Sequence, residues 1–418
     1  MVSSTGDFEM SQPIAYGIDF GTSNSSIAVA YPTKEVLLDE LSMPGVASLL
    51  YLDSSGLELV GENAVQQFLL GIDPTQSRLM ASLKSHLADD LFTSTKSWGL
   101  EWGLEDLTKV ILQYFKTESD RRLDADVKRV LIGYPPVFVG AEGDQENLQN
   151  LALERLERAA FLAGFKEVEF LDEPTAALYH DDLESGINLA IDFGAGTFDV
   201  SVVRYASRPK RTEVLATHGT GIGGDLFDRA VFNLALYKRF DFEILNYGDP
   251  IKEACMIAGM LGLVRDSNSL SRMATLIHQK PRSGLRLLQR IIQNGQAYAL
   301  SKAVEKAKIE LSQATSATVE LYRRDAGIAI HEIIVRDKFE NEISHYINQV
   351  FEIIDLTLKD AGLRAREVDQ VMLTGGSCNI PLFKRKVRSK FSSSNVISED
   401  VASRVALGLA REARRIWS

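Results

Sequence analysis

The chain has 418 residues, enough for two or three folding units, and its 45% hydrophobic and 25% charged residues are typical of globular proteins. Its net charge of -11 argues against a general nucleic-acid-binding surface. The first residues lack a basic start and an apolar core, and no apolar run approaches the ~18 residues of a membrane span. We therefore expect a cytoplasmic protein with neither nucleic acid nor membrane as partner.

Cysteines and histidines give no sign of a transition-metal site. The two cysteines, Cys255 and Cys378, lie far apart and lack metal-ligand spacing, so we expect both to be buried or incidental. The six histidines form no pair of the HExxH kind. A transition-metal enzyme is not expected.

The first half of the chain alternates strands and helices. Apolar and polar residues alternate over 16–31 and 48–61, which predicts antiparallel hairpins. Apolar residues at helical spacing predict an amphipathic helix over Leu104–Leu123. A strand then stops at Pro135, a helix follows, and a short strand runs into another helix with Pro174 in its first turn. This order is typical of layered α/β folds.

The same order restarts near residue 187, which predicts an internal duplication. A hairpin with its turn over 204–212 is followed by a glycine-rich turn, a long helical tract and a strand before a Gly-Gly turn. We expect lobe I to span 1–187. A C-terminal helix over 398–418 is expected to pack against lobe I and to expose its basic face to solvent. Lobe II is expected over 188–397, with a mostly helical subdomain at about 226–313.

Two small-residue turns follow strands that end in an aspartate, Asp19 in the first half and Asp192 in the second. Such turns let backbone N–H groups approach a phosphate, and the preceding carboxylate suits Mg²⁺. One copy alone could be only a tight hairpin, but two copies predict a clamp on a polyphosphate. The turns are Gly21, Thr22, Ser23 and Asn24, and Gly194, Ala195, Gly196 and Thr197.

Two more glycine-rich turns lead into helices. The amino end of a helix favours anions, and a Gly-Gly turn lets a nucleoside lie against backbone. Each alone could be an ordinary helix start. The residues concerned are Gly223, Gly224 and Asp225, and Gly375, Gly376, Ser377 and Asn379.

Taken in order, these segments resemble the nucleotide-binding domain of the seventy-kilodalton heat-shock chaperone family (DnaK type), within the actin-like ATPase superfamily. The matching motifs are GIDFGTSNSS, DEPTAALYH, IDFGAGTFDVSVV, GIGGDLFD, AVEKAKIELSQAT and LTGGSCNIP. Within the family, the chain looks most like the short bacterial relatives of the YegD type. The resemblance implies an α/β, ribonuclease H-like duplication of two lobes with a nucleotide cleft between them.

The resemblance also implies roles for individual residues, with ATP or ADP and Mg²⁺ as cofactors. Asp19 and Asp192 would organise the magnesium ion, and the two turns would cradle the phosphates. Lys84, in SLKSHL, would stabilise charge near the γ-phosphate, although the sequence alone also allows a surface lysine. Further implied roles are Glu173 and Asp199 near the attacking water, Pro135 as the switch between lobes, and Glu305, Lys308 and Ser312 around ribose and adenine.

Three departures from the family pattern bear on function. Ala195 replaces the middle glycine of the second turn. If this position requires a positive φ, the added methyl group pushes toward the γ-phosphate, and hydrolysis would be slowed or lost while binding persists. Ile309 and Asn379 stand where the family has arginines that stack on adenine, so base affinity or choice would differ. The sequence also stops before the family's peptide-binding domain, so we expect none here.

Three functions are compatible with these patterns. The first is a slow, switch-like, Mg-ATP-hydrolysing protein of the chaperone type with a protein client or partner. The second is a nucleotide-binding regulatory or scaffold protein with little hydrolysis. The third is a small-molecule kinase of the same fold, for which no acceptor is indicated. The sequence leaves the oligomeric state open.

Overall fold

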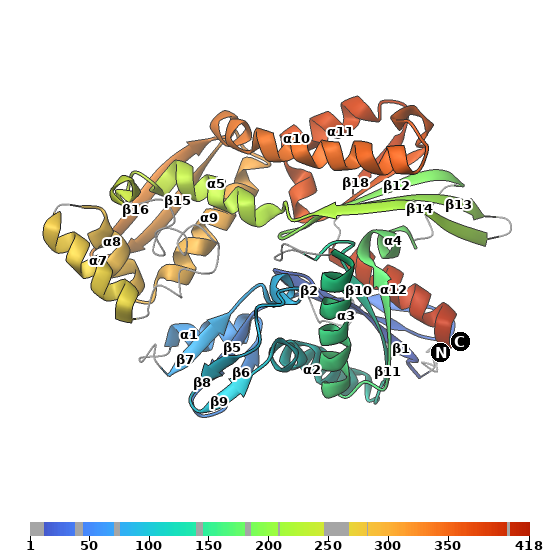
Figure 1. Ribbon diagram of the computed structural model, residues 1–418, viewed down its shortest axis with the longest axis horizontal. Helices are drawn as coiled ribbons and strands as arrows, with labels where there is room; N and C mark the ends of the chain where they lie inside the picture. The colour runs from blue at the N-terminus through green and yellow to red at the C-terminus, as the bar shows by residue number, and fades with distance from the viewer. Residues whose placement is uncertain are drawn as a thin grey trace, which may run out of the picture.

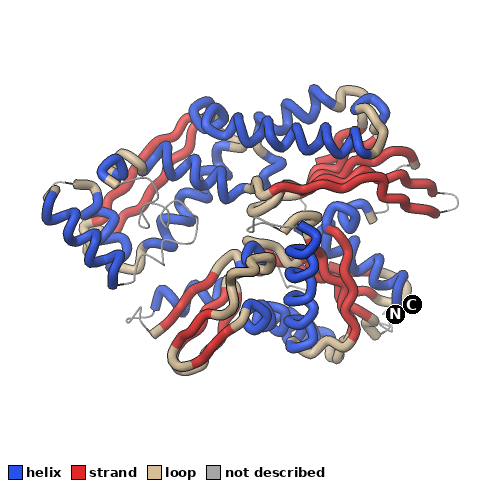
Figure 2. The backbone as a smooth tube through the Cα atoms, in the orientation of Figure 1, coloured by secondary structure: helices blue, strands red, loops and turns tan. Residues whose placement is uncertain are grey.

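The protein is described by a computed structural model that covers residues 12–37, 45–70, 76–138, 145–179, 185–207, 210–245, 267–281, 283–398 and 402–418. Cys255 and most of the N-terminal segment considered above lie outside these ranges. Two large β-sheets, one from each half of the chain, lie on opposite sides of a central layer of helices (Figures 1 and 2). Among the described residues no helix is both long and apolar enough to cross a membrane.

The first half of the chain builds a six-stranded sheet in the order β11-β10-β1-β2-β3, with β4 also paired to β2. Strand β1 runs antiparallel to β2 and parallel to β10, and β10 runs parallel to β11. The predicted hairpin over 16–31 is thus confirmed. The strands are β1 Ala15–Asp19, β2 Asn24–Ala30, β3 Glu35–Leu37, β4 Val46–Ala47, β10 Arg129–Tyr134 and β11 Glu167–Asp172.

The second half repeats this arrangement in a five-stranded sheet, β14-β13-β12-β17-β18. An antiparallel hairpin is again followed by two parallel strands, which confirms the predicted duplication. The predicted turn over 204–212 is too long, because β13 and β14 pair as far as Ser207 and Lys210. The strands are β12 Gly186–Phe193, β13 Phe198–Ser207, β14 Lys210–Thr220, β17 Gln370–Thr374 and β18 Asn395–Ser398.

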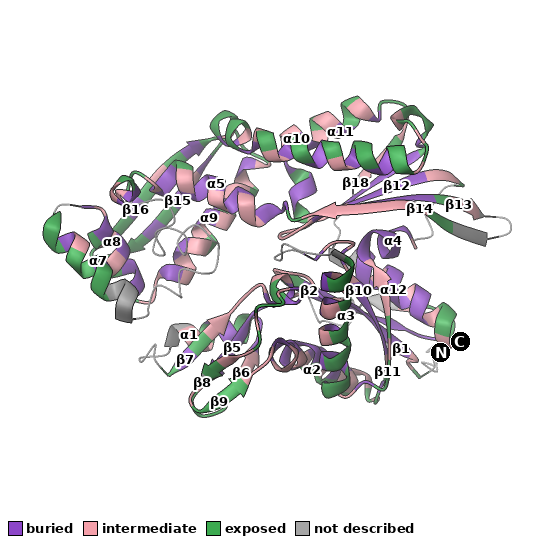
Figure 3. Ribbon diagram, viewed as in Figure 1, coloured by how far each residue is buried: buried purple, intermediate pink, exposed green. Residues whose placement is uncertain are grey.

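Helices cover the outer faces of both sheets. Helix α2 (Leu104–Leu123), with the bounds predicted, and α3 (Gln145–Leu162) pack on the first sheet around a buried cluster that includes Tyr16, Ile132 and Phe165. The long helix α10 (Arg336–Asp360) and α11 (Pro381–Lys390) cover the second sheet. In Figure 3 the inner strand β10 is mostly buried, whereas the edge strand β14 is mostly intermediate.

Helices α4 (Glu173–Leu178) and α12 (Ala402–Trp417) lie between the two sheets (Figure 1). The side-chain carboxylate of Asp172 caps α4 by accepting a hydrogen bond of 2.9 Å from the Thr175 N–H, with Pro174 in the first turn. Ala176 packs in the cluster that α12 forms on the first sheet, whereas Leu178 packs against the second sheet. Helix α4 therefore connects the two sheets through its buried side chains.

The basic residues of α12 are not simply solvated, so that prediction is wrong for Arg411. Its Nε donates a hydrogen bond of 2.5 Å to Glu35 Oε1 on β3, and its Nη1 donates one of 2.9 Å to the carbonyl oxygen of Tyr179. Arg414 Nη1 also forms an ion pair with Glu35 Oε2 at 3.2 Å. These contacts attach the C-terminal helix to the first sheet and to the end of α4.

Smaller units flank the cleft in both halves. In the first, the sheet β6-β5-β7 carries α1, with the hairpin β8-β9 beside it. In the second, the predicted helical tract packs on a two-stranded sheet, β15-β16, which we did not predict; residues 246–266 of that tract lie outside the described ranges. The elements are β5 Leu50–Asp53, β6 Glu58–Val60, α1 Glu62–Leu70, β7 Ser77–Met80, η2 Leu83–His86, β8 Thr95–Ser97, β9 Leu100–Trp102, α5 Gly224–Leu236, η3 Phe242–Ile244, α7 Ser267–Gln279, α8 Leu285–Gln293, α9 Ala297–Leu311, β15 Ser316–Arg323, β16 Ile328–Val335, η5 Ala365–Glu367 and η6 Gly376–Asn379.

The close packing of α12 on α4 predicts that Gly408→Ala destabilises the protein. A Cβ at Gly408 would lie 1.8 Å from the carbonyl oxygen of Ala176. Helix propensity alone would make the substitution stabilising by about 1 kcal/mol. We expect instead a decrease of about 2 kcal/mol in the free energy of unfolding, measured by urea denaturation, because overpacking against backbone dominates.

Gly45→Ala is the matched control, since its Cβ would have one neighbour, at an ordinary 3.7 Å. It should change the free energy of unfolding by less than about 0.5 kcal/mol. A Gly408→Ala protein at least as stable as the wild type would contradict the described packing.

Candidate functional site

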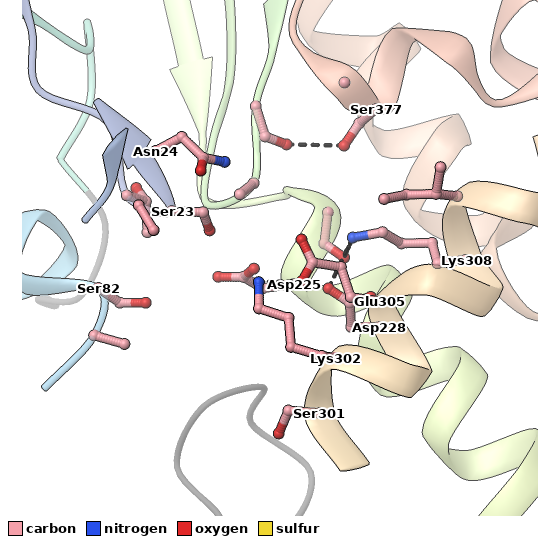
Figure 4. Close-up of a pocket in the computed structure, with 18 of the residues that line it drawn as sticks. Ser23, Asn24, Ser82, Asp225, Asp228, Ser301, Lys302, Glu305, Lys308 and Ser377 are labelled. Atoms are coloured by element: carbon pink, nitrogen blue, oxygen red, sulfur yellow. Dashed lines mark hydrogen bonds and ion pairs between the residues drawn. The ribbon is translucent and has the colours of Figure 1, made fainter. Parts of the chain in front are cut away.

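A cavity of about 610 Å³ lies between the two halves of the molecule. Both small-residue turns, the start of α5, one face of α9 and the segment leading into α11 line it, and Figure 4 shows the polar side chains that point into it. The cavity brings together many of the predicted site residues: Thr22, Ser23, Asn24, Gly194, Ala195, Gly224, Asp225, Glu305, Lys308, Ser312, Gly376, Ser377 and Asn379.

The two turns approach each other across this cavity. The first connects β1 to β2, and the second connects β12 to β13. A Cβ at Gly196 would lie only 2.8 Å from Thr22 Oγ1 and 3.2 Å from its methyl group. Glycine at this position therefore permits the turn from one half to contact the turn from the other.

The first turn is held by two buried serines that we did not predict. The backbone N–H of Gly21 donates to Ser25 Oγ at 3.2 Å, and Ser48 Oγ donates to the Gly21 carbonyl oxygen at 2.7 Å. The two serine hydroxyls are themselves 2.8 Å apart. A Cβ at Gly21 would lie 2.0 Å from the carbonyl oxygen of Asn24, so this tight turn requires glycine.

The second turn is held by the start of α5. The N–H groups of Gly224 and Asp225 donate to the carbonyl oxygens of Gly194 and Ala195, at 3.0 and 2.8 Å. These two N–H groups are thus already bonded to protein, contrary to our expectation that the amino end of this helix would be open to an anion. A Cβ at Gly223 would lie 2.2 Å from the Ala195 carbonyl oxygen.

The Gly-Gly turn before α11 supports the same region. Ser377 Oγ donates a hydrogen bond of 2.8 Å to the Gly194 carbonyl oxygen. Gly375 has a φ of +84°, and a Cβ there would lie 2.3 Å from the carbonyl oxygen of Phe193. Both residues therefore position the second turn, and Gly375 requires the conformational freedom of glycine.

Ala195 causes no backbone strain. The described non-glycine residues with positive φ are Ser82, Trp98, Asp124 and Asp241, so Ala195 is not among them. A positive φ at Ala195, the condition under which we expected hydrolysis to be slowed, is therefore absent.

A cluster of charged residues lies beside the turns. Asp19 is the last residue of β1, and Glu173 is the first residue of α4. Asp192 lies near the end of β12, and Asp199 is its register partner on the neighbouring strand β13. Lys84, on η2, is buried, and its Nζ forms an ion pair with Glu173 Oε1. The alternative of a surface lysine at this position is therefore wrong.

Burial and repulsion from neighbouring carboxylates make the three aspartates of this cluster hard to ionise. Burial, followed by repulsion from Glu173, raises the pKa of Asp19 and of Asp199 well above the ordinary value, and that of Asp192 to about 6. Burial alone would lower the pKa of Lys84, but Glu173 and Asp19 raise it above its ordinary value. The lysine therefore stays charged.

The charge balance of this cluster fits a divalent cation. Four carboxylates, those of Asp19, Glu173, Asp192 and Asp199, interact electrostatically with the single ammonium group of Lys84. Across the described residues, no three His, Cys, Asp or Glu side chains are placed to enclose a metal ion. The arrangement suits Mg²⁺, which binds through one or two carboxylates together with water and phosphate.

One face of α9 adds polar groups to the cavity. Lys308 Nζ donates hydrogen bonds to Asp228 Oδ2 at 2.7 Å and to the Gly224 carbonyl oxygen at 3.2 Å. Lys302 Nζ forms an ion pair with Glu305 Oε2 at 2.6 Å (Figure 4). We did not predict Asp228, Tyr298 or Lys302. Tyr298, Lys302 and Glu305 are spaced by four and three residues, so helical periodicity could have revealed this face.

The cavity contains a carboxylate that titrates near neutrality. Burial raises the pKa of Asp225 to about 7, with an opposing effect from Lys308 and a further increase from Asp228. A folded-state pKa above the unfolded value means that the charged form destabilises the fold, and this penalty grows as the pH rises from about 4 to 7. Asp225→Asn should therefore raise the melting temperature at about pH 8, and the gain should disappear as the pH falls toward 4.

Asp325→Asn serves as the control, because Asp325 is exposed and its pKa is lowered. Differential scanning calorimetry of both variants across this pH range should show a gain only for Asp225→Asn. A gain that did not vary with pH would contradict the assigned pKa of Asp225.

Comparison with known proteins identifies the family. A family model described as "Hsp70 protein" matches residues 72–243 and 289–414. The chain is 26% identical over 408 residues to "Chaperone protein DnaK" of Thermosipho melanesiensis, covering 95% of this chain and 58% of that protein. It is 25% identical over 414 residues to "Chaperone protein DnaK" of Mycoplasmopsis agalactiae, covering 96% and 58%. Because the family model spans more than half of it, this chain belongs to the Hsp70 family and has the actin-like ATPase fold.

Proposed function

We propose that this chain binds Mg-ATP in the cavity between its lobes and slowly hydrolyses it to ADP and phosphate. The observation that carries the proposal is the meeting of two phosphate-type turns, at Gly196 and Thr22, beside a buried lysine and four carboxylates. The chain spans 58% of the length of the curated relatives it matches, so their name alone does not establish this activity.

In this mechanism the protein supplies positioning and charge. The N–H groups of the two turns that remain free would hold the phosphate chain, and the ammonium group of Lys84 would offset negative charge on the transferred phosphoryl group. Glu173 and Asp199 would accept hydrogen bonds from the attacking water. Mg²⁺, held through Asp19 and Asp192, would supply positive charge near the phosphates. No covalent intermediate on the protein is required.

The proposal includes a protein partner that responds to the nucleotide state of this chain. It also includes a cytoplasmic location. The relatives are named as chaperones, which supports a chaperone-like role. The alternative, a regulatory protein without turnover, rests on Ala195, and the φ of that residue gives it no support because it is not positive. A kinase acting on a small molecule has no structural observation in its favour.

Replacing the buried lysine tests the catalytic assignment. Lys84→Met should slow single-turnover ATP hydrolysis by about 10²–10³-fold, because it removes a preorganised positive charge from the reacting phosphate. Quenched-flow measurement of phosphate release gives the rate, and calorimetry with a non-hydrolysable analogue should show a change of less than about tenfold in ATP affinity.

Lys96→Met is the matched control, because Lys96 is exposed and its ion pair with Glu101, at 3.7 Å, lies on the β8-β9 hairpin. It should hydrolyse ATP at the wild-type rate. A Lys84→Met protein that binds ATP and hydrolyses it as fast as the wild type would refute the role of Lys84.

Replacing Ala195 by glycine separates the hydrolysing protein from the regulatory alternative. Because Ala195 is not in the left-handed region, Ala195→Gly should change the single-turnover rate by less than about threefold. An increase of about 100-fold would show that the methyl group suppresses hydrolysis in the wild type, which favours the regulatory alternative.

A further inference from the structure

The loop that follows the buried Lys84 is held by one arginine from a distant part of the chain. Arg155, on α3, donates hydrogen bonds of 2.8 Å from Nη1 to the carbonyl oxygens of Leu87 and Asp89. Its Nη2 donates a third hydrogen bond, also of 2.8 Å, to the carbonyl oxygen of Phe92. A single guanidinium group therefore fixes three points along the backbone of this loop.

The chemistry of this contact requires an arginine. A guanidinium group presents five N–H donors in a rigid planar fork, whereas an ammonium group is a compact point charge with three donors. The last carbonyl groups of a helix have no partner within the helix, and Leu87 caps the end of η2. Because the three acceptors are main-chain oxygens, the loop cannot shift without lengthening at least one of the bonds to Arg155.

This contact lies one hydrogen bond away from the backbone of Lys84. The N–H group of Leu87 donates to the carbonyl oxygen of Lys84 at 3.2 Å, so residue 87 connects that backbone to Arg155. Leu83 and Leu87 are buried in the same apolar cluster as Leu156 of α3. The short helix η2 is therefore fixed relative to α3 by apolar packing and by the guanidinium group.

The backbone at the other end of η2 also depends on support from its surroundings. Ser82, directly before η2, has a φ of +57°, in the left-handed region, which is uncommon for serine. Such a conformation costs free energy and persists only where the surrounding structure imposes it. The Lys84 side chain that η2 carries forms its ion pair with Glu173, on α4. A change in the direction of η2 would therefore move the ammonium group relative to the carboxylate cluster.

We propose that Arg155 is a positioning residue for Lys84, because it holds the backbone of η2 so that the ammonium group stays beside the carboxylate cluster and the two turns. The inference rests on the proposed function and adds a residue that does not line the cavity. Arg155 acts only through Lys84. Misplacing a catalytic group by about 1 Å can slow a reaction by about 100-fold. Loss of Arg155 should therefore slow hydrolysis and leave nucleotide binding almost unchanged.

Single-turnover hydrolysis of ATP by the whole chain tests this proposal. Arg155→Met should lower the rate by about tenfold, while the affinity for a non-hydrolysable ATP analogue, measured by calorimetry, should change by less than about threefold. Arg155→Lys keeps the positive charge but cannot span three carbonyl oxygens, so its rate should be intermediate. Arg158→Met is the matched control on the same helix, because the Arg158 side chain is 73% exposed and lies 3.6 Å from Glu105. It should hydrolyse ATP at the wild-type rate.

A double-mutant cycle separates positioning from general stabilisation of the fold. In a Lys84→Met background, Arg155→Met should change the rate by less than about twofold, because the group that Arg155 positions is absent. Equal slowing in both backgrounds would indicate a general loss of structure and would overturn the inference. If Arg155→Met does not fold, Arg155→Lys in the two backgrounds gives the same comparison.

The outcomes also separate this inference from the proposed function. A wild-type rate in Arg155→Met, combined with slow hydrolysis in Lys84→Met, would overturn the role of Arg155 and leave the proposed function intact. A wild-type chain that binds no ATP analogue, or that hydrolyses no ATP, would reject the proposed function and this inference with it.

Discussion

The contact between Gly196 and Thr22 constrains the rest of the cleft. It joins a turn from each of two similar sheets, and no side chain beyond hydrogen fits at Gly196 without displacing Thr22. The cavity opens beside this contact, with its lining drawn from both lobes. A phosphate chain placed there would meet backbone from both halves, so its binding would favour the closed arrangement of the lobes.

The residues around the turns act mainly by holding them in place. Serine side chains support the first turn, and the first N–H groups of α5, together with Ser377, support the second. Preorganised donors cost little reorganisation when charge develops, which is why rigid turns suit phosphoryl transfer. The buried carboxylates around Lys84 are an unfavourable arrangement unless a further cation binds, which supports the proposed metal-bound ligand.

Local patterns predicted much of this architecture, and contacts over long sequence distances were not predictable. The hairpin over 16–31, helix α2 and the duplication followed from periodicity and motif order. The partner of Lys84 is 89 residues away, so its burial had no local signal. The same holds for Arg411 and Glu35. The β15-β16 hairpin did carry a local signal, because its buried and exposed residues largely alternate, and we missed it.

The central claim is that both turns bind the same phosphate chain. A crystal structure of the whole chain with Mg²⁺ and a non-hydrolysable ATP analogue tests it most directly. We predict phosphate oxygens within hydrogen-bond distance of backbone N–H groups in 21–24 and in 194–197 of the same molecule. Phosphates bound to one turn only, or a nucleotide bound elsewhere, would contradict the claim.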